Sequence, residues 1–151
     1  TRKQFLLSRF PERWRIFFAQ PPGAGRGDPW RARTEGRVTC FTVPFLKPAT
    51  TNPLYNAIAG TAAGRAVIEA AATAHLTRQL RRLGVGPDPV VLVSNIYGAH
   101  ALSRLAPKLI FYDFNDHPLQ FAGVRPWAER YWRATLDQVD ERWRDFVRRT
   151  Y

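Results

Sequence analysis

The chain has 151 residues, of which 45% are hydrophobic, so its length suits one domain and its composition excludes a largely disordered polypeptide. Its formal net charge of +11 comes almost wholly from arginine and favours anionic partners such as nucleic acid, phosphorylated ligands or an anionic membrane surface. Cys40 is the single cysteine, which excludes an intrachain disulfide and a Cys/His zinc site, and no apolar run is long enough to span a bilayer.

The first predicted element is a helix over residues 1–10, where apolar side chains recur at helical spacing before Pro11. The aromatic run 14–22 ends in two prolines and predicts a buried strand. Residues 23–36 are rich in glycine and charge and show no periodicity, so they are predicted to form a loop. The alternating run 37–45 predicts a second strand.

A long alanine-rich stretch over residues 54–83 predicts one helix, because its apolar residues recur at steps of three and four. Asn52 is predicted to cap the amino end of this helix, with Pro53 at the first helical position. Gly84 is the predicted C′ residue at the carboxyl end. Two glycines within the stretch are predicted to mark a bend or a close packing contact: Gly60 and Gly64.

The last part of the chain alternates between strand and helix patterns. Residues 90–95 predict a parallel strand, 96–107 a short helix, 108–114 the next strand and 126–149 a final helix. Strands that alternate with helices are typical of α/β proteins. We therefore predict an α/β fold with a doubly wound, mostly parallel sheet and flanking helices.

Polar residues stand at the carboxyl ends of both late strands. Ser94 and Asn95 end the first strand, where they either cap the next helix or lie beside backbone N–H groups that hold an anion. The end of the second strand carries a cluster of polar side chains: Asp113, Asn115, Asp116 and His117. A carboxylate can accept hydrogen bonds from sugar hydroxyls or act as a general base. We expect one of the two acids to cap the following segment and leave a ligand role open for the other.

Other features of the chain have structural explanations. Residues 21–29 suggest a phosphate-binding loop but lack the GxxxxGK[ST] and GxGxxG spacings, so we predict a surface loop. His75 and His100 are predicted to be packed or half-exposed helical residues. Three tryptophans of the last helix are predicted to lie in the core: Trp127, Trp132 and Trp143.

Three short motifs stand at the ends of predicted elements. They are Arg2-Lys3-Gln4 at the first helix, Gln20-Pro21-Pro22 after the first strand, and a YD-x-x-D element formed by Tyr112, Asp113 and Asp116. In this order, over most of residues 2–123, they resemble the amino-terminal half of bacterial GT-B glycosyltransferases. Those enzymes transfer a sugar from an activated donor to an acceptor, often a polysaccharide or a lipid-linked glycan.

The resemblance implies a Rossmann-like domain that mainly holds the acceptor and binds no cofactor or metal of its own. The nucleotide-sugar donor is expected on a second, carboxy-terminal domain. Asp113 or Asp116 is the implied catalytic base that activates the acceptor hydroxyl. The implied acceptor-binding residues are Ser94, Asn95, Asn115 and His117.

Residues 1–151 are expected to form a single domain, about half of a GT-B enzyme. The first strand of the sheet and the donor-binding domain are expected to be missing, because Thr1 begins where that strand should already have ended. The chain is then a fragment, or is completed by a partner, or is a reduced relative with another role.

The basic surface has two interpretations. Four arginines are predicted to contact an anionic membrane from its cytoplasmic face or to steer a phosphorylated acceptor: Arg2, Arg9, Arg13 and Arg15. The alternative is a non-catalytic binding module for nucleic acid or a protein complex, in which arginines contact phosphates and aromatic side chains stack on bases. No recognised nucleic-acid motif is present, and a hydrolase is disfavoured because the chain has no G-x-S-x-G motif.

Overall fold

The computed structural model describes residues 9–22, 30–47, 50–94, 96–112 and 125–139. The chain divides into two compact units, Thr1–Pro44 and Phe45–Tyr151, and each is described by itself. The prediction of one domain over residues 1–151 stays a prediction.

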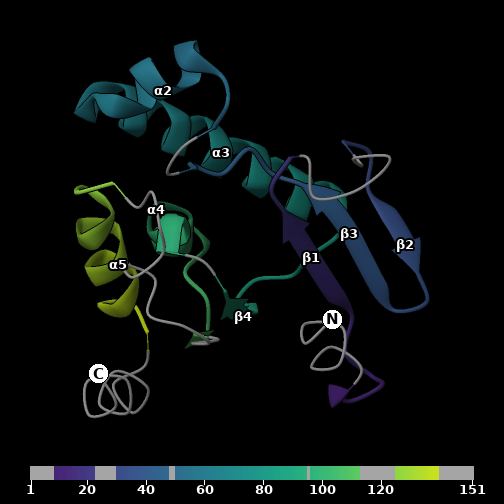
Figure 1. Ribbon diagram of the computed structural model, residues 1–151. Coiled ribbons are helices and arrows are strands. Elements are labelled where there is room, and N and C mark those ends of the chain that lie inside the picture. Colours follow the sequence, from purple (N-terminus) through teal and green to yellow (C-terminus); the bar gives the residue numbers. More distant parts are fainter. Residues whose placement is uncertain (1–8, 23–29, 48–49, 95, 113–124, 140–151) are drawn as a thin grey trace. The chain divides into compact units, whose positions relative to one another are not determined.

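The first unit contains a three-stranded sheet (Figure 1). Strands β1 (Ile16–Gln20) and β3 (Val38–Thr42) pair in parallel, with Ile16 opposite Val38 and Gln20 opposite Thr42. Strand β2 (Arg33–Glu35) pairs antiparallel with β3 on its other side. The two strands predicted for this region are therefore confirmed.

Strand β2 corrects the prediction of a loop over residues 23–36. Glu35 pairs with Val38, which leaves a two-residue hairpin connection, and Gly36 at its first position has a φ of +57°. Glycine adopts this left-handed conformation without steric cost. The hydroxyl oxygens of Thr34 and Thr39 lie 3.0 Å apart across the two strands. The strand was missed because its three residues are polar and exposed, so they carry no apolar alternation.

The second unit begins with two helices in place of the single helix predicted over residues 54–83. Helix α2 (Pro53–Gly60) and helix α3 (Ala62–Arg82) meet at Thr61, which ends the first and caps the second. The Thr61 hydroxyl accepts a hydrogen bond from the Gly64 amide at 3.0 Å, an N-cap that starts a new helix. The predicted bend is therefore confirmed, and it divides the helix completely.

The outer ends of this helical pair form as predicted. The Asn52 side chain accepts a hydrogen bond from the Tyr55 amide at 3.1 Å, and Pro53 occupies the first turn. Gly84 has a φ of +67° just beyond α3. The Gly84 and Val85 amides donate to the carbonyls of Arg81 and Leu80, respectively, which satisfies carbonyl groups of the last turn.

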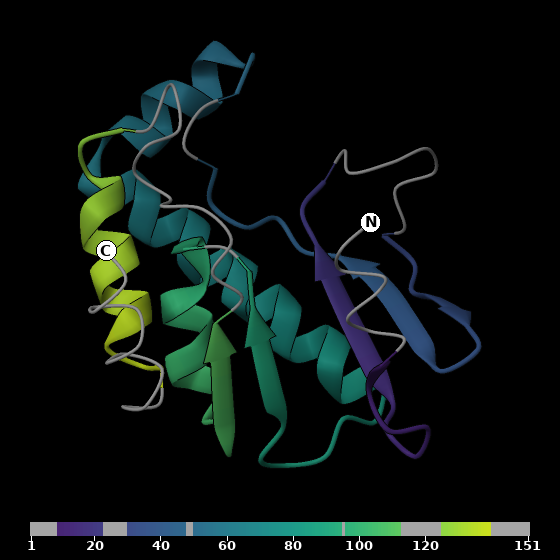
Figure 2. The same ribbon diagram turned by 60° about the horizontal axis from the view of Figure 1, so that its bottom comes forward.

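The rest of the second unit alternates strands and helices in the predicted order. It contains β4 (Val90–Val93), the short 3-10 helix η1 (Ile96–Gly98), α4 (Ala99–Leu105), β5 (Leu109–Tyr112) and α5 (Ala128–Leu136). Figure 2 shows β4 and β5 side by side with the helices α4 and α5 beside them. The two strands are parallel, and Val90 pairs with Leu109. The predicted helix over 126–149 is confirmed for α5, and residues 140–149 lie outside the described residues.

One face of the β4–β5 pair contributes to a packed core, whereas Val90 and Leu92 on the other face of β4 are exposed. The buried members of this core come from β4, β5, α4 and the chain at and beyond α5: Val93, Ile110, Leu102, Ala128 and Val139. Trp127 and Trp132 pack against these residues, as predicted, and Trp143 lies outside the described residues. The described structure is therefore a mixed α/β fold with parallel strand pairs and flanking helices. None of its described helices is both long and apolar enough to cross a membrane.

Candidate functional site

The carboxyl ends of β4 and β5 define the edge at which the sequence predicts a site. Val93 and Tyr112, the last residues of the two strands, pair directly across the parallel ladder. The chain therefore leaves both strands at the same edge. Ligands of open α/β sheets bind outside the carboxyl ends of the strands. The acceptor site predicted from the sequence lies at this edge of the strand pair.

The structure describes one of the predicted polar residues at this edge. Ser94 follows Val93 directly and is exposed to solvent. The other candidates lie outside the described residues: Asn95, Asp113, Asn115, Asp116 and His117. Their roles stay predictions. Ser94 places an exposed side-chain hydroxyl, which can donate and accept hydrogen bonds, directly after β4.

The predicted anion-contacting arginines belong to the first unit. Arg9, Arg13 and Arg15 are exposed, whereas Arg2 lies outside the described residues. Arg13 and Arg15 precede Ile16 and therefore lie at the amino end of β1, opposite to the edge at Gln20. The Arg15 guanidinium lies 5.0 Å from the centre of the Phe17 ring, a cation–π contact. These arginines form a basic group at the amino end of the β1 strand.

A second candidate site is a pocket that the sequence did not predict. It has a volume of about 390 Å³ and lies within the second unit, among helices α3, α4 and α5. Its walls carry polar and charged groups: Glu69, His100, Ser103, Arg130, Tyr131 and Gln138. Three alanines complete its lining: Ala62, Ala66 and Ala134.

Two hydrogen bonds connect the helices around this pocket. The Tyr131 hydroxyl of α5 donates to the Glu69 carboxylate of α3 at 3.1 Å. The Thr73 hydroxyl and His100 Nδ1 lie 2.9 Å apart, joining α3 to α4. His100, which the sequence treats as a packed or half-exposed residue, is half-buried and lines the pocket.

Burial changes the acid–base properties of the Glu69–Tyr131 pair. It raises the pKa of Glu69, and the Tyr131 hydroxyl, His100, Arg130 and Arg65 lower that pKa to a smaller extent. Burial and the nearby Glu69 carboxylate raise the pKa of Tyr131. Tyr131 therefore stays protonated at neutral pH and donates to Glu69.

An aromatic cluster lies behind the pocket. The Tyr131 ring contacts Tyr97 at 6.0 Å and Trp127 at 5.4 Å between ring centres. Burial, with the nearby Tyr55, raises the pKa of Tyr97 to about 12. Arg65, which is only 6% exposed, lies 4.9 Å from the centre of a Trp127 ring and donates to two carbonyl oxygens at the end of α2. These contacts hold Tyr131, a residue of the pocket wall, and the aromatic rings around it in place.

The sequence carries only a weak signal for this pocket. Ala62, Ala66 and Glu69 recur at helical spacing, as do Arg130, Ala134 and Gln138. Such spacing shows which residues share one helix face, but it cannot show that three helices meet. The described residues contain no group of three or more His, Cys, Asp or Glu side chains placed to hold a metal ion.

Comparison of the chain with protein-family models, with curated proteins and with solved structures gave no significant match.

Proposed function

We propose that this chain is the acceptor-side domain of a GT-B-like glycosyltransferase. The observation that carries the proposal is the parallel pairing of Val93 with Tyr112, because it brings the ends of β4 and β5 to one edge. The motif resemblance supports the same assignment, with Gln20-Pro21-Pro22 after β1 and the YD-x-x-D element after β5. The proposal includes a doubly wound, Rossmann-like arrangement of the whole sheet.

In this proposal the edge beyond β4 and β5 binds the acceptor glycan. Ser94, Asn95, Asn115 and His117 exchange hydrogen bonds with acceptor hydroxyls. Asp113 or Asp116 takes the proton from the attacking hydroxyl as it forms a bond to the anomeric carbon of the donor sugar. The bond from that carbon to the nucleotide diphosphate breaks, and the nucleotide leaves with the electron pair. A carboxy-terminal domain supplies the donor site and closes the reaction off from water.

The basic group at the amino end of β1 has a separate role in the proposal. Arg9, Arg13 and Arg15 are exposed and carry positive charge that attracts an anionic membrane surface on its cytoplasmic side. Arg13 and Arg15 lie at the amino end of β1, where they would contact lipid.

The described residue Ser94 provides the test of this proposal. Sugar transfer is measured with the full-length gene product that contains residues 1–151, using radiolabelled UDP-glucose and other nucleotide sugars with lipid-linked and polysaccharide acceptors. Ser94→Leu should raise the KM for the acceptor about tenfold and leave the KM for the donor unchanged, because a bulky apolar group replaces a hydroxyl at the acceptor edge. Ala74→Leu, an exposed change on α3, is the matched control. Transfer that Ser94→Leu leaves unaltered would contradict the assignment of this edge.

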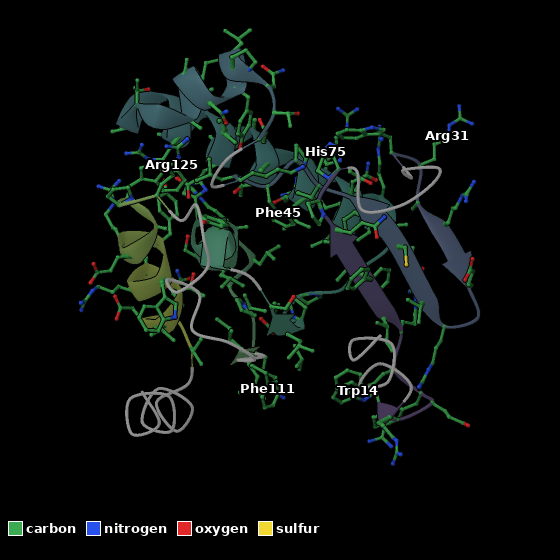
Figure 3. All side chains as sticks on the ribbon, in the orientation of Figure 1. Trp14, Arg31, Phe45, His75, Phe111 and Arg125 are labelled. Carbon is green, nitrogen blue, oxygen red and sulfur yellow. The ribbon has the colours of Figure 1, made fainter. Side chains whose placement is uncertain are left out.

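A second candidate function is a non-catalytic module that binds nucleic acid. It is favoured by two tryptophans beside arginines in the first unit, Trp14 at 38% and Trp30 at 52% exposure. Figure 3 shows Trp14 and Arg31 at opposite ends of the three-stranded sheet, so these groups do not form one continuous patch there. Binding to generic single-stranded RNA that falls steeply with salt, together with no transfer from any nucleotide sugar, would select this function.

A further inference from the structure

We propose that the pocket among α3, α4 and α5 binds a small neutral polyhydroxyl compound of about the size of one sugar ring. This inference does not depend on the proposed transfer activity. The pocket is lined entirely by helical residues or, for Gln138, by the turn after α5, and Ser94 is not part of its lining.

The dimensions of the pocket suit a small ligand. Its volume of about 390 Å³ lies near the lower end of the range for ligand pockets in proteins. The side chains of Ala62, Ala66 and Ala134 are small and make part of the lining apolar. Such a surface can contact the C–H groups of a ring, while polar groups around it fix the orientation of the ring.

The polar groups of the pocket include both donors and acceptors. The Glu69 carboxylate accepts one hydrogen bond from Tyr131 and has further acceptor capacity. Arg130 adds donors, whereas the Ser103 hydroxyl donates to the His100 carbonyl oxygen at 2.8 Å and adds acceptor lone pairs. Both side chains are exposed to solvent. His100 uses Nδ1 toward Thr73, which leaves Nε2 for a second partner. Hydroxyl groups match this mixture, because each can both donate and accept.

The charges of the lining favour a neutral ligand. The Glu69 carboxylate and the Arg130 guanidinium both line the pocket, so their charges offset each other. An anion would meet the Glu69 carboxylate, and a cation would meet Arg130. A neutral polyhydroxyl compound avoids both repulsions and can still form charge-assisted hydrogen bonds with each group.

The pocket wall is held in place before any ligand arrives. Tyr131 is 7% exposed and is fixed by its hydrogen bond to Glu69 and by its contacts with Tyr97 and Trp127. Thr73, also 7% exposed, orients the His100 ring. A wall that is already ordered lowers the entropy cost of binding.

The test is titration of the isotope-labelled chain with D-glucose, D-galactose, D-mannose and myo-inositol, followed by amide NMR shifts. At least one compound should bind with a Kd on the order of millimolar and shift the amides of His100, Ser103 and Gln138. Inorganic phosphate is titrated in parallel. No saturable shift of these amides with any of the four compounds up to about 100 mM would overturn the proposal. Tighter binding of phosphate than of all four would also overturn it.

Two substitutions show whether binding occurs in this pocket. Ala66→Leu places a larger side chain in the lining and should weaken binding at least tenfold. Ala70→Leu makes the same change at an exposed position on the same helix outside the lining, and should leave the Kd unchanged. Arg130→Gln removes the exposed cation without altering the core and should weaken binding several-fold. Equal Kd values for Ala66→Leu and Ala70→Leu, with both variants folded, would contradict the location.

Discussion

The close approach of α2 and α3 predicts opposite effects on stability for alanine substitutions at two glycines, Gly60 and Gly64, which are four residues apart. A Cβ atom added at Gly64 would lie 2.0 Å from the carbonyl oxygen of Ile58 and 2.7 Å from its carbonyl carbon. It would also lie 2.8 Å from the Ile58 Cγ2 atom. A Cβ added at Gly60 meets no atom within 4 Å. Gly64→Ala should therefore destabilise the chain, whereas Gly60→Ala should not.

The expected magnitudes follow from these distances. Alanine in place of glycine inside a helix is ordinarily favourable by about 1 kcal/mol. At Gly64 the closest contacts are with the backbone, so α2 must move by more than a flexible side chain would, and overpacking of this kind costs about 1–3 kcal/mol. The clash is severe enough to place the overpacking cost at about 3 kcal/mol. The gain in helix propensity offsets about 1 kcal/mol of it, so the free energy of unfolding should fall by about 2 kcal/mol. Gly60→Ala should gain about 0.5–1 kcal/mol, because the unfolded chain loses conformational freedom.

The assay is urea denaturation of both variants and the unmodified chain, followed by far-ultraviolet circular dichroism. The free energy of unfolding should fall for Gly64→Ala and rise slightly for Gly60→Ala, with similar denaturant dependence in all three proteins. A Gly64→Ala variant as stable as the unmodified chain would refute the close approach of α2 to α3.

Three further predictions concern side chains that the structure places in defined surroundings. Arg65→Ala should lower the free energy of unfolding by about 2–4 kcal/mol, because two carbonyl groups lose a charged donor. Arg78→Ala, on the exposed face of α3, is the control and should change this free energy by less than about 0.5 kcal/mol. Burial raises the pKa of Glu69, so the folded chain holds this proton more tightly and loses stability as pH rises from 4.5 through the folded pKa. Glu69→Gln should remove this loss of stability, measured by urea denaturation across the same pH range. A variant with the same pH dependence of stability as the unmodified chain would contradict the role of Glu69. Burial, and to a smaller extent the Glu35 carboxylate, raise the pKa of the Cys40 thiol. Glu35→Gln should therefore speed the reaction of Cys40 with a thiol reagent at pH 7. A slower reaction would contradict the contribution of Glu35.

Local signals in the sequence predicted the elements whose ends depend on neighbouring residues. Asn52 and Pro53 start α2, and Gly84 follows α3, because each of these residues satisfies or avoids a backbone group within one turn. The parallel strands β4 and β5 were also predicted, since their apolar runs alternate with helical patterns. These features are encoded over short distances along the chain.

The bend and the close packing predicted at Gly60 and Gly64 form, but the complete division at Thr61 was missed, because the helical periodicity continues across it. Features that depend on distant contacts were not predictable. The pocket needs Glu69 and Tyr131, which are 62 residues apart, to meet. For the predicted acceptor site, the structure describes the strand ends and Ser94, so the roles of Asp113 and Asp116 stay predictions.

The most direct test of the glycosyltransferase assignment is the effect of removing both acids from the YD-x-x-D element. Transfer from the preferred nucleotide sugar is compared between the full-length gene product and its Asp113→Asn/Asp116→Asn variant, with Asp137→Asn as the exposed control. Loss of the base should lower kcat/KM by about 10²-fold or more, while the control keeps its activity. Full transfer by the double variant, or no transfer by the unmodified full-length product, would contradict the account.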